Sequence, residues 1–236
     1  MRNLFFLIIS LFLLSSCHWH SIKGDGHVVT DERSVSDFRN VKLRGFMNVY
    51  LTQEATTKVT IEGEENIIQH IRTYKENNNL IISTESGWRL RNTKPVNVYV
   101  SAPMLEEIGI SGSGDIIGKT KLTSDRRLEF SIAGSGNINT DVDAPEVKVD
   151  IGGSGNSEVK GRTKDLSIEI AGSGKAQAKE LMSENANVNI AGSGNAYVYA
   201  SSKLDVRVAG SGDVYYLGKP QITSHIAGSG TVKALE

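Results

Sequence analysis

The sequence has 236 residues, with 26 Lys and Arg, 27 Asp and Glu, 24 Gly and one Cys. This length allows one or two domains with a substantial core. The formal charge of −1 at pH 7 excludes the basic excess that displaces counterions from nucleic acid, so we expect no nucleic-acid partner. One Cys excludes an intrachain disulfide scaffold and a cysteine zinc site, and we expect neither a metal nor a cofactor.

The first 16 residues have the pattern of a secretory signal. A start containing Arg2 precedes an apolar run over residues 4–14 that is shorter than the roughly 20 residues needed to span a bilayer. Leu14-Ser15-Ser16-Cys17 resembles a bacterial lipobox, which implies cleavage after residues 1–16 and lipidation of Cys17. An ordinary cleaved signal beside an unmodified Cys is the alternative.

Residues 17–27 are predicted to be the lipidated Cys and a short tether. A lipid-bearing N-terminus makes the membrane a partner and places the protein in the cell envelope. Position 18 is His and not Asp, and by analogy with enteric sorting rules we expect the outer membrane, with the leaflet left open.

A Gly-Ser-Gly tripeptide recurs seven times, at intervals of 18 to 22 residues, and contains 14 of the 24 glycines. The repeats begin at Gly112, Gly134, Gly153, Gly172, Gly192, Gly210 and Gly228. Two positions before each first glycine stands an aliphatic residue: Ile110, Ile132, Ile151, Ile170, Ile190, Val208 and Ile226. The positions four and six residues before the turn are also mostly apolar, and the positions between them are mostly polar. This alternation predicts a half-buried strand before each turn.

A shorter alternating segment follows each turn and predicts a second strand. Two glycines allow a tight turn with φ > 0, and the Asn or Asp that usually comes next is expected to bond local amides. A unit of about 19 residues with two strands buries its apolar face only by stacking on its copies. We therefore predict an all-β, right-handed β-solenoid over residues 104–236. A meander of β-hairpins is the alternative.

Residues 28–103 are predicted to be a degenerate β-rich region that caps the solenoid. The segment 41–50 aligns with 206–215 as a repeat that has lost its second glycine, and strands are expected over 58–62, 80–84 and 96–101. Ile67, Ile68, Ile71 and Tyr74 have the spacing of one short helix. Trp88 is expected on a loop. Whether this region is a separate domain or part of the solenoid stays open.

The lipobox, the Phe38-x-x-Val41 strand entry, the segment Val98-Tyr99-Val100-Ser101-Ala102-Pro103-Met104-Leu105 and the repeated turns resemble the auto-transporter adhesin, head GIN domain family of bacterial envelope proteins. The resemblance covers roughly residues 25–236. It implies a β-helical, adhesin-like protein and supplies no catalytic motif.

The glycine-rich turns do not have the pattern of a ligand loop. The dinucleotide fingerprint needs a further glycine and a helix, whereas a strand follows here. Gly152-Gly153-Ser154-Gly155-Asn156 lacks the Asp of the calcium-binding nonapeptide, and Asp115 and Asp213 are expected to bond within turns.

An acidic patch is the weaker of two candidate sites. Asp150 and Glu169 occupy the same offset in consecutive repeats, which places them about 4.8 Å apart on adjacent rungs, with Lys148 on the same face. Such a pair could share a proton or hold a cation. A solvated sheet face is the simpler explanation, so we expect no catalytic residue and no enzyme, with a polysaccharide-acting enzyme or lectin as the alternative.

Tyrosines on the second strand form the other candidate. Tyr197 and Tyr215 share one outward column, and Tyr199 lies two residues beyond Tyr197. Stacked rings suit a sugar or a partner chain, although a tyrosine ladder also stabilises neighbouring rungs.

The sequence thus predicts a lipid-anchored envelope protein whose rigid solenoid surface serves adhesion or binds an extended glycan or protein. A structural, self-assembling envelope protein is a further alternative, which would make a homo-oligomer.

Overall fold

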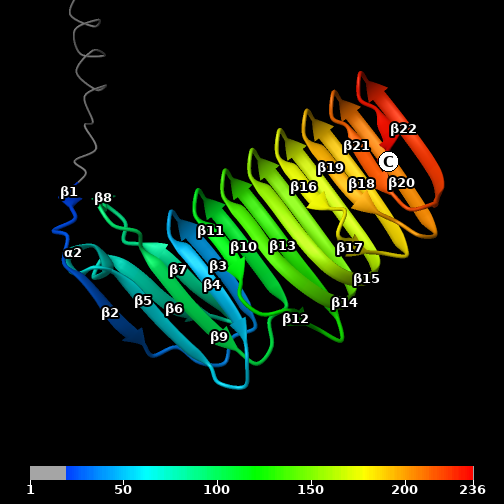
Figure 1. The fold of residues 1–236 in the computed structure, drawn as a ribbon. Helices are drawn as coiled ribbons and strands as arrows, with labels where there is room; N and C mark the ends of the chain where they lie inside the picture. Colours follow the sequence, from blue (N-terminus) through cyan, green and yellow to red (C-terminus); the bar gives the residue numbers. More distant parts are fainter. Residues whose placement is uncertain (1–19, 236) are drawn as a thin grey trace, which may run out of the picture.

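The structure is a computed structural model that describes residues 20–235, and strands stacked along one axis dominate it (Figure 1). Each rung consists of a strand, a glycine turn and a second strand. The strands before the turns form one sheet, the pre-turn sheet, and those after the turns form another, the post-turn sheet. The predicted signal peptide and Cys17 lie outside the described residues. Within residues 20–235, no helix combines the length and the apolar character that crossing a membrane requires.

The pre-turn sheet contains, in spatial order, β6 (Ile71–Glu76), β7 (Asn79–Thr84), β3 (Asn40–Gly45), β10 (Glu107–Gly112), β13 (Arg127–Gly134), β14 (Asn137–Gly153), β15 (Asn156–Gly172), β18 (Asn185–Gly192), β20 (Lys203–Gly210) and β22 (Gln221–Gly228). All pairs are parallel except β6 with β7. Both β14 and β15 are long enough to continue from one sheet into the other.

The post-turn sheet contains β2 (Val28–Arg33), β5 (Lys58–Glu64), β9 (Asn97–Ala102), β4 (Asn48–Gln53), β11 (Asp115–Gly118), the first parts of β14 and β15, β16 (Lys175–Ala178), β19 (Asn195–Tyr199), β21 (Val214–Leu217) and β23 (Val232–Ala234). The short strands β12 (Leu122–Thr123) and β17 (Leu181–Met182) pair with the bends of β14 and β15.

The predicted aliphatic spine is continuous from Ile110 to Val208, but its last predicted member, Ile226, is exposed, because β22 is the last strand of the sheet within residues 20–235. Ile110, Ile132, Ile151, Ile170, Ile190 and Val208 are successive partners across the pre-turn sheet, and all are buried. Because strands pair with the matching strand of the next rung and not across their own turn, the hairpin meander is wrong and the stacked solenoid is confirmed.

The two glycines of each turn have different roles. Gly172 has a φ of +128°, and a Cβ there would lie 2.4 Å from the carbonyl oxygen of Gly153 on the preceding rung. Gly174 has no positive φ, but its Cβ would lie 2.5 Å from both the Gly155 oxygen and a methyl group of Ile151. The expectation that both glycines supply φ > 0 is therefore wrong for the second one, which is needed for close packing of rungs.

The polar residue after most of the turns bonds to a neighbouring rung. Asn137 donates to Asp115 Oδ1 at 2.7 Å, and Asn156 donates to Asn137 Oδ1 at 2.9 Å. Asp213 accepts from the Thr231 backbone N–H at 2.9 Å. The prediction that these side chains bond inside their own turn is wrong, because in-register stacking brings a matching donor within reach on the neighbouring rung.

The region 28–103 contributes rungs to the same stack. β3 pairs in register with β10 and β4 with β11, so the segment 41–50 is the degenerate repeat that the sequence predicted. Met47 occupies the place of the second glycine and is fully buried. At the outer edge of the stack, β2 runs antiparallel to β5.

The one predicted helix is present but shorter than its spacing indicated. α2 covers Glu65–Ile68, whereas Ile71 and Tyr74 belong to strand β6. Pairing of β6 with β7 satisfies the backbone groups that a longer helix would have bonded internally. Trp88, expected on a loop, lies in β8 (Trp88–Arg91), which pairs with β1 (His20–Lys23). The prediction of a tether over residues 17–27 is therefore wrong for residues 20–23, because backbone pairing with β8 makes them a strand of the folded part.

The carboxylate of Glu64 fastens the N-terminal segment to the stack. Its two oxygens accept the backbone N–H of Gly26 at 2.8 Å, that of Thr93 at 2.7 Å, that of Lys94 at 3.1 Å and the Thr93 hydroxyl at 2.6 Å. These bonds, led by the Thr93 hydroxyl, hold the pKa of Glu64 at about 2, below its ordinary 4.5. The segments that follow β1 and β8 are therefore locked together.

We expect Gly172→Ala to lower the free energy of unfolding by roughly 2 kcal/mol or more, because it combines an unfavourable φ with a backbone clash. Ser173→Ala in the same turn is the control, since Ser173 is exposed and its loss should change stability by less than about 0.5 kcal/mol. Urea unfolding followed by circular dichroism measures both. Equal stability of the two variants would contradict the role assigned to the first glycine.

We also expect stability to depend on the ionisation of Glu64. Because its pKa is lowered on folding, its contribution is present above pH 4.5 and disappears as the pH falls from 4.5 towards 2. Glu64→Gln should be less stable than the wild type at pH 7, and this difference should shrink over that window. Glu54→Gln, at an exposed position, is the matched control. A difference that stays constant from pH 7 to pH 2 would rule out this carboxylate as the cause.

Candidate functional site

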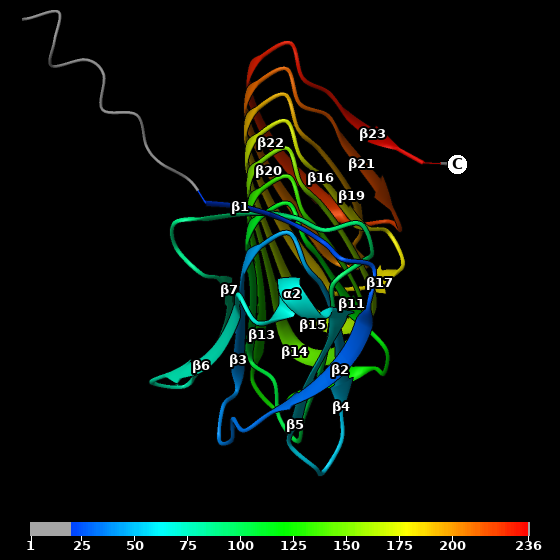
Figure 2. The same cartoon turned by 90° about the vertical axis from the view of Figure 1, so that its left-hand side faces the viewer.

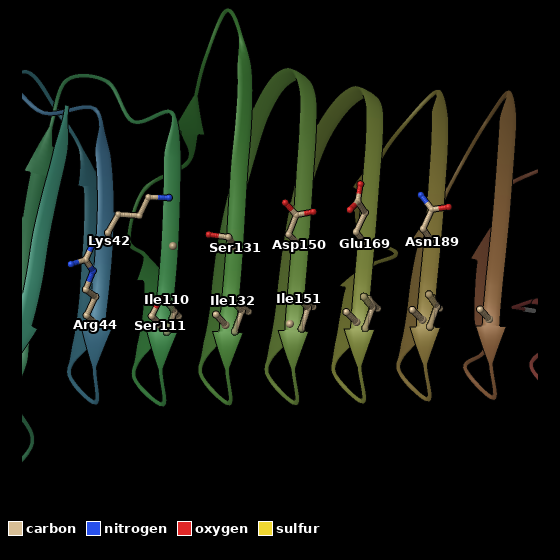
Figure 3. Close-up of a pocket in the computed structure, with 18 of the residues that line it drawn as sticks. Lys42, Arg44, Ile110, Ser111, Ser131, Ile132, Asp150, Ile151, Glu169 and Asn189 are labelled. Atoms are coloured by element: carbon tan, nitrogen blue, oxygen red, sulfur yellow. The ribbon is translucent and has the colours of Figure 1, made fainter. Parts of the chain in front are cut away.

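A groove of about 760 Å³ runs along the outer surface of the pre-turn sheet, beside the glycine turns (Figure 3). It extends from Arg44 on β3 to Arg207 on β20 and His225 on β22, so it crosses the strands and follows the stacking direction. Most of the residues that line it occupy the same positions relative to the turn in consecutive repeats, so each rung from β10 to β20 contributes one residue of each kind of position to the groove.

The floor of the groove consists of small residues one position before the first glycine of each turn. They are Ser111, Ala133, Gly152, Ala171, Ala191 and Ala209. Each of these residues directly follows a residue of the buried spine, so it points to the opposite, outer side of the sheet. Because none of them has a large side chain, they leave a shallow apolar channel. The aliphatic residues of the spine also contribute to the lining.

One side of the groove carries a polar row, three positions before the turns. In Figure 3, Ser131, Asp150, Glu169 and Asn189 project from successive strands towards the same side. The complete row is Lys42, Gly109, Ser131, Asp150, Glu169, Asn189, Arg207 and His225. The two anions, Asp150 and Glu169, lie side by side near the middle of the row, and Lys42 and Arg207 lie towards its ends, so the net charge of the row is small.

The predicted acidic patch lies in this row. Asp150 and Glu169 are direct partners on adjacent rungs, and Lys148 Nζ lies 2.8 Å from Asp150 Oδ2. Asp150 raises the pKa of Lys148, which stays a cation and balances the neighbouring carboxylate instead of acting as a base. Asp150 Oδ1 is buried and has no hydrogen-bond partner in residues 20–235. The geometry brings all three predicted residues together.

The β6–β7 hairpin borders the groove at its N-terminal end. Figure 2 shows β6 projecting beside the pre-turn sheet, and Glu76, Asn79 and Ile81 of this hairpin line the groove. The side chain of Lys42 passes over Gly109, which has no side chain, and forms an ion pair with Glu107. Arg44 Nη2 lies 3.9 Å from Glu76 Oε2. Two ion pairs therefore lie at this end of the groove.

The predicted tyrosines lie on the other sheet. Tyr197 and Tyr215 stack, with ring centroids 4.8 Å apart and planes inclined by 14°, and Lys175 Nζ lies 5.9 Å from the Tyr197 centroid. Asp213 raises the pKa of Tyr215. Tyr199 shares the face of Tyr197, but its partner on the next rung is Leu217, so it is outside the stack.

A second tyrosine pair, which sequence reasoning missed, occupies the same outward column at the N-terminal end. Tyr50 and Tyr99 stack with centroids 5.2 Å apart, and Lys119 Nζ lies 4.6 Å from the Tyr50 centroid. The sequence alignment of segment 41–50 with 206–215 places Tyr50 at the position of Tyr215, so Tyr50 could have been predicted to lie in this column. Tyr99 follows only from the pairing of β4 with β9.

The groove floor was also missed, although its signal is in the sequence: the residue before every Gly-Ser-Gly is Ser, Ala or Gly. Among residues 20–235, no group of three or more His, Cys, Asp or Glu side chains is arranged to hold a metal ion. The surface thus offers an extended apolar channel with regularly spaced polar groups and, on the other sheet, stacked aromatic rings.

Comparisons with known proteins agree with this architecture. The structure is similar to a crystal structure titled "Putative lipid binding protein" from Parabacteroides distasonis, at 28% identity and a TM-score of 0.77, covering 92% of this chain and 100% of that one. It is also similar to a crystal structure titled "putative adhesin" from Bacteroides fragilis, at 25% identity and a TM-score of 0.85, covering 91% and 100%. A search of curated proteins gives no match.

The family model described as "Putative auto-transporter adhesin, head GIN domain" matches residues 37–220, which include most of the stacked rungs and all but the last Gly-Ser-Gly turn. This match covers more than half of the chain and confirms the resemblance seen in the sequence. The protein therefore belongs to the auto-transporter adhesin, head GIN domain family.

Proposed function

We propose that the protein is a lipid-anchored adhesin of the cell envelope that binds an extended polypeptide segment of a partner in the groove of the pre-turn sheet. Cys17 carries the anchor, and residues 18 and 19 connect it to β1, the first strand of the folded part. The signal pattern of residues 1–16 and the lipobox support the anchor. Family membership supports an adhesive role.

The observation that carries the proposal is the continuity of the groove across consecutive rungs. An extended chain presents groups at regular intervals, and from Ser131 to His225 the polar row presents one polar side chain on every rung, about every 4.8 Å along the stack. Ala133, Ala171 and Ala191 give such a chain an apolar floor that it can approach closely. A rigid scaffold of this kind loses little entropy on binding.

The chemistry of the groove favours a polypeptide over a glycan. Apart from His225, none of the residues that line it is aromatic, whereas sugars stack on aromatic rings. Apolar contacts along the floor and hydrogen bonds to Ser131, Asp150, Glu169 and Asn189 suit an extended peptide with alternating side chains. The tyrosine pair Tyr197–Tyr215 is the candidate surface for a glycan.

We expect the double variant Ala171→Arg/Ala191→Arg to lose binding to an array of immobilised extended peptides by at least tenfold. Both positions are exposed, so the fold should tolerate the change, while two long side chains fill the floor. Tyr197→Ala/Tyr215→Ala, on the other sheet, is the control and should bind the peptide array like the wild type.

The same proteins are tested on a glycan array. A wild-type signal on glycans alone, abolished by the tyrosine variant and unaffected by the alanine-to-arginine variant, would overturn the groove proposal in favour of the tyrosine surface. Circular dichroism of each variant shows whether the fold is retained.

A polysaccharide-acting enzyme is the second candidate, because Asp150 and Glu169 do lie side by side in a groove. We propose that the protein is not an enzyme, since Lys148 neutralises Asp150 and no nucleophile with its own base accompanies the pair.

We expect no new reducing ends when the protein is incubated with polygalacturonate or alginate, and no difference between the wild type and Asp150→Asn/Glu169→Gln. Reducing ends that appear with the wild type and vanish with this variant would replace the adhesin by an enzyme.

A further inference from the structure

A two-stranded parallel sheet marks the place where the chain enters the folded part. β1 pairs with β8 residue by residue, and the backbone N–H of His20 donates to the Gly87 oxygen at 3.1 Å. Figures 1 and 2 place this pair at the end of the stack opposite β22. The Glu64 carboxylate fixes the segments that follow both strands, so the pair is a rigid part of the surface.

The two faces of this small sheet differ in chemistry. Ile22 and Leu90, which are direct partners, pack against the hydrophobic core. Residues alternate in direction along a strand, so Lys23, Arg89 and Arg91 point to the opposite side, and all three are exposed. Lys23 and Arg91 are direct partners, which brings two cations together.

These cations have no acidic partner within the described part of the chain. About half of the other Lys and Arg side chains in residues 20–235 form ion pairs with Asp or Glu, as Lys148 does with Asp150, but none of these pairs involves Lys23, Arg89 or Arg91. The carboxylate of Asp25, the acidic residue that follows β1, accepts the His27 backbone N–H. The face is therefore a positive patch whose cations form no ion pair within residues 20–235, while the neighbouring carboxylates of Asp25 and Glu64 accept backbone N–H groups.

The proposed lipid anchor on Cys17 brings this patch close to the bilayer surface. Cys17 precedes His20 by three residues, which span at most about 11 Å even when fully extended. A lipidated Cys17 holds the backbone at the headgroup region of the bilayer. The tether is thus short enough to let β1 approach the lipid phosphates to within one Debye length, about 8 Å at physiological ionic strength, where their attraction for cations is strong.

We propose that the Lys23–Arg89–Arg91 face of the β1–β8 pair docks on the surface of an anionic phospholipid bilayer and sets the orientation of the protein on its membrane. This inference rests on the lipid anchor proposed above. The tether keeps the patch at a high effective concentration over the headgroups, so three cations suffice where a free protein would need more. Docking at this end points the stack away from the membrane and carries the last rung about 34 Å beyond the first, at a rung spacing of about 4.8 Å. The groove is then presented outward along its length.

The test uses the mature chain, residues 17–236, with Cys17 coupled chemically to a maleimide-bearing lipid in vesicles. Trp19→Phe leaves Trp88, beside the patch, as the single Trp. Energy transfer from Trp88 to a dansyl-labelled headgroup lipid is compared in vesicles of phosphatidylcholine with and without phosphatidylglycerol. We expect transfer to increase with phosphatidylglycerol and the increase to disappear in high salt.

Lys23→Glu/Arg89→Glu/Arg91→Glu should abolish the increase, whereas Lys219→Glu/Lys233→Glu, near the far end of the stack, should not. Equal transfer in both kinds of vesicle, or an unchanged increase in the triple variant, would overturn the docking surface. Glu64→Gln, which loosens the support of the sheet without altering the patch, should reduce the increase.

Because the tether is chemical, this result does not depend on processing in the cell. Mass spectrometry of the protein from its native membrane tests the anchor separately. Retention of residues 1–16 or an unmodified Cys17 would remove the proposed anchor and leave the vesicle result standing.

Discussion

The close contact of backbones at the glycine corners is the constraint on which the rest of the structure depends. Each first glycine lies so near the carbonyl oxygen of the glycine one rung earlier that a single methyl group would collide with it, as at Gly172 over Gly153. This contact holds successive rungs in the same register, because any slip would place a residue with a side chain at the corner. The aliphatic spine, the Asn and Asp ladder and the tyrosine stacks all require that register.

The same constraint generates the surface. When every rung has the same register, outward residues at one offset become a line along the stack, and a line of small residues becomes a groove. A single small residue such as Ala171 forms no channel by itself. The channel forms because Ala171 and Ala191 are neighbours on adjacent rungs. The polar row, with Asp150 beside Glu169, arises in the same way. The adhesion that we propose for this surface would depend on repeated groups along the stack and not on a single pocket.

The two ends of the molecule differ in structure. At the C-terminal end, β22 has no buried residue, and Ile222 and Ile226 are 39% and 40% exposed. At the N-terminal end, β2, α2 and the β1–β8 pair surround the first rungs, and the buried carboxylate of Glu64 holds them in place. The end nearest the predicted lipid is thus the more elaborately built, which fits a molecule supported at that end.

The sequence by itself determined the repeat, the strands on both sides of each turn and the buried aliphatic column, because these depend on periodicities that are visible along the chain. It also placed Tyr197 over Tyr215 and Asp150 beside Glu169, since matching offsets become neighbours in any stacked arrangement. Only the tertiary structure decided where the irregular region 28–103 belongs. There, the antiparallel pairing of β6 with β7 replaced part of the expected helix, and β9 brought Tyr99 to Tyr50. The Glu64 carboxylate bonds to backbone groups that follow β1 and β8, at Gly26 and Thr93. These residues are far apart in the sequence, and no local sequence pattern predicts such contacts.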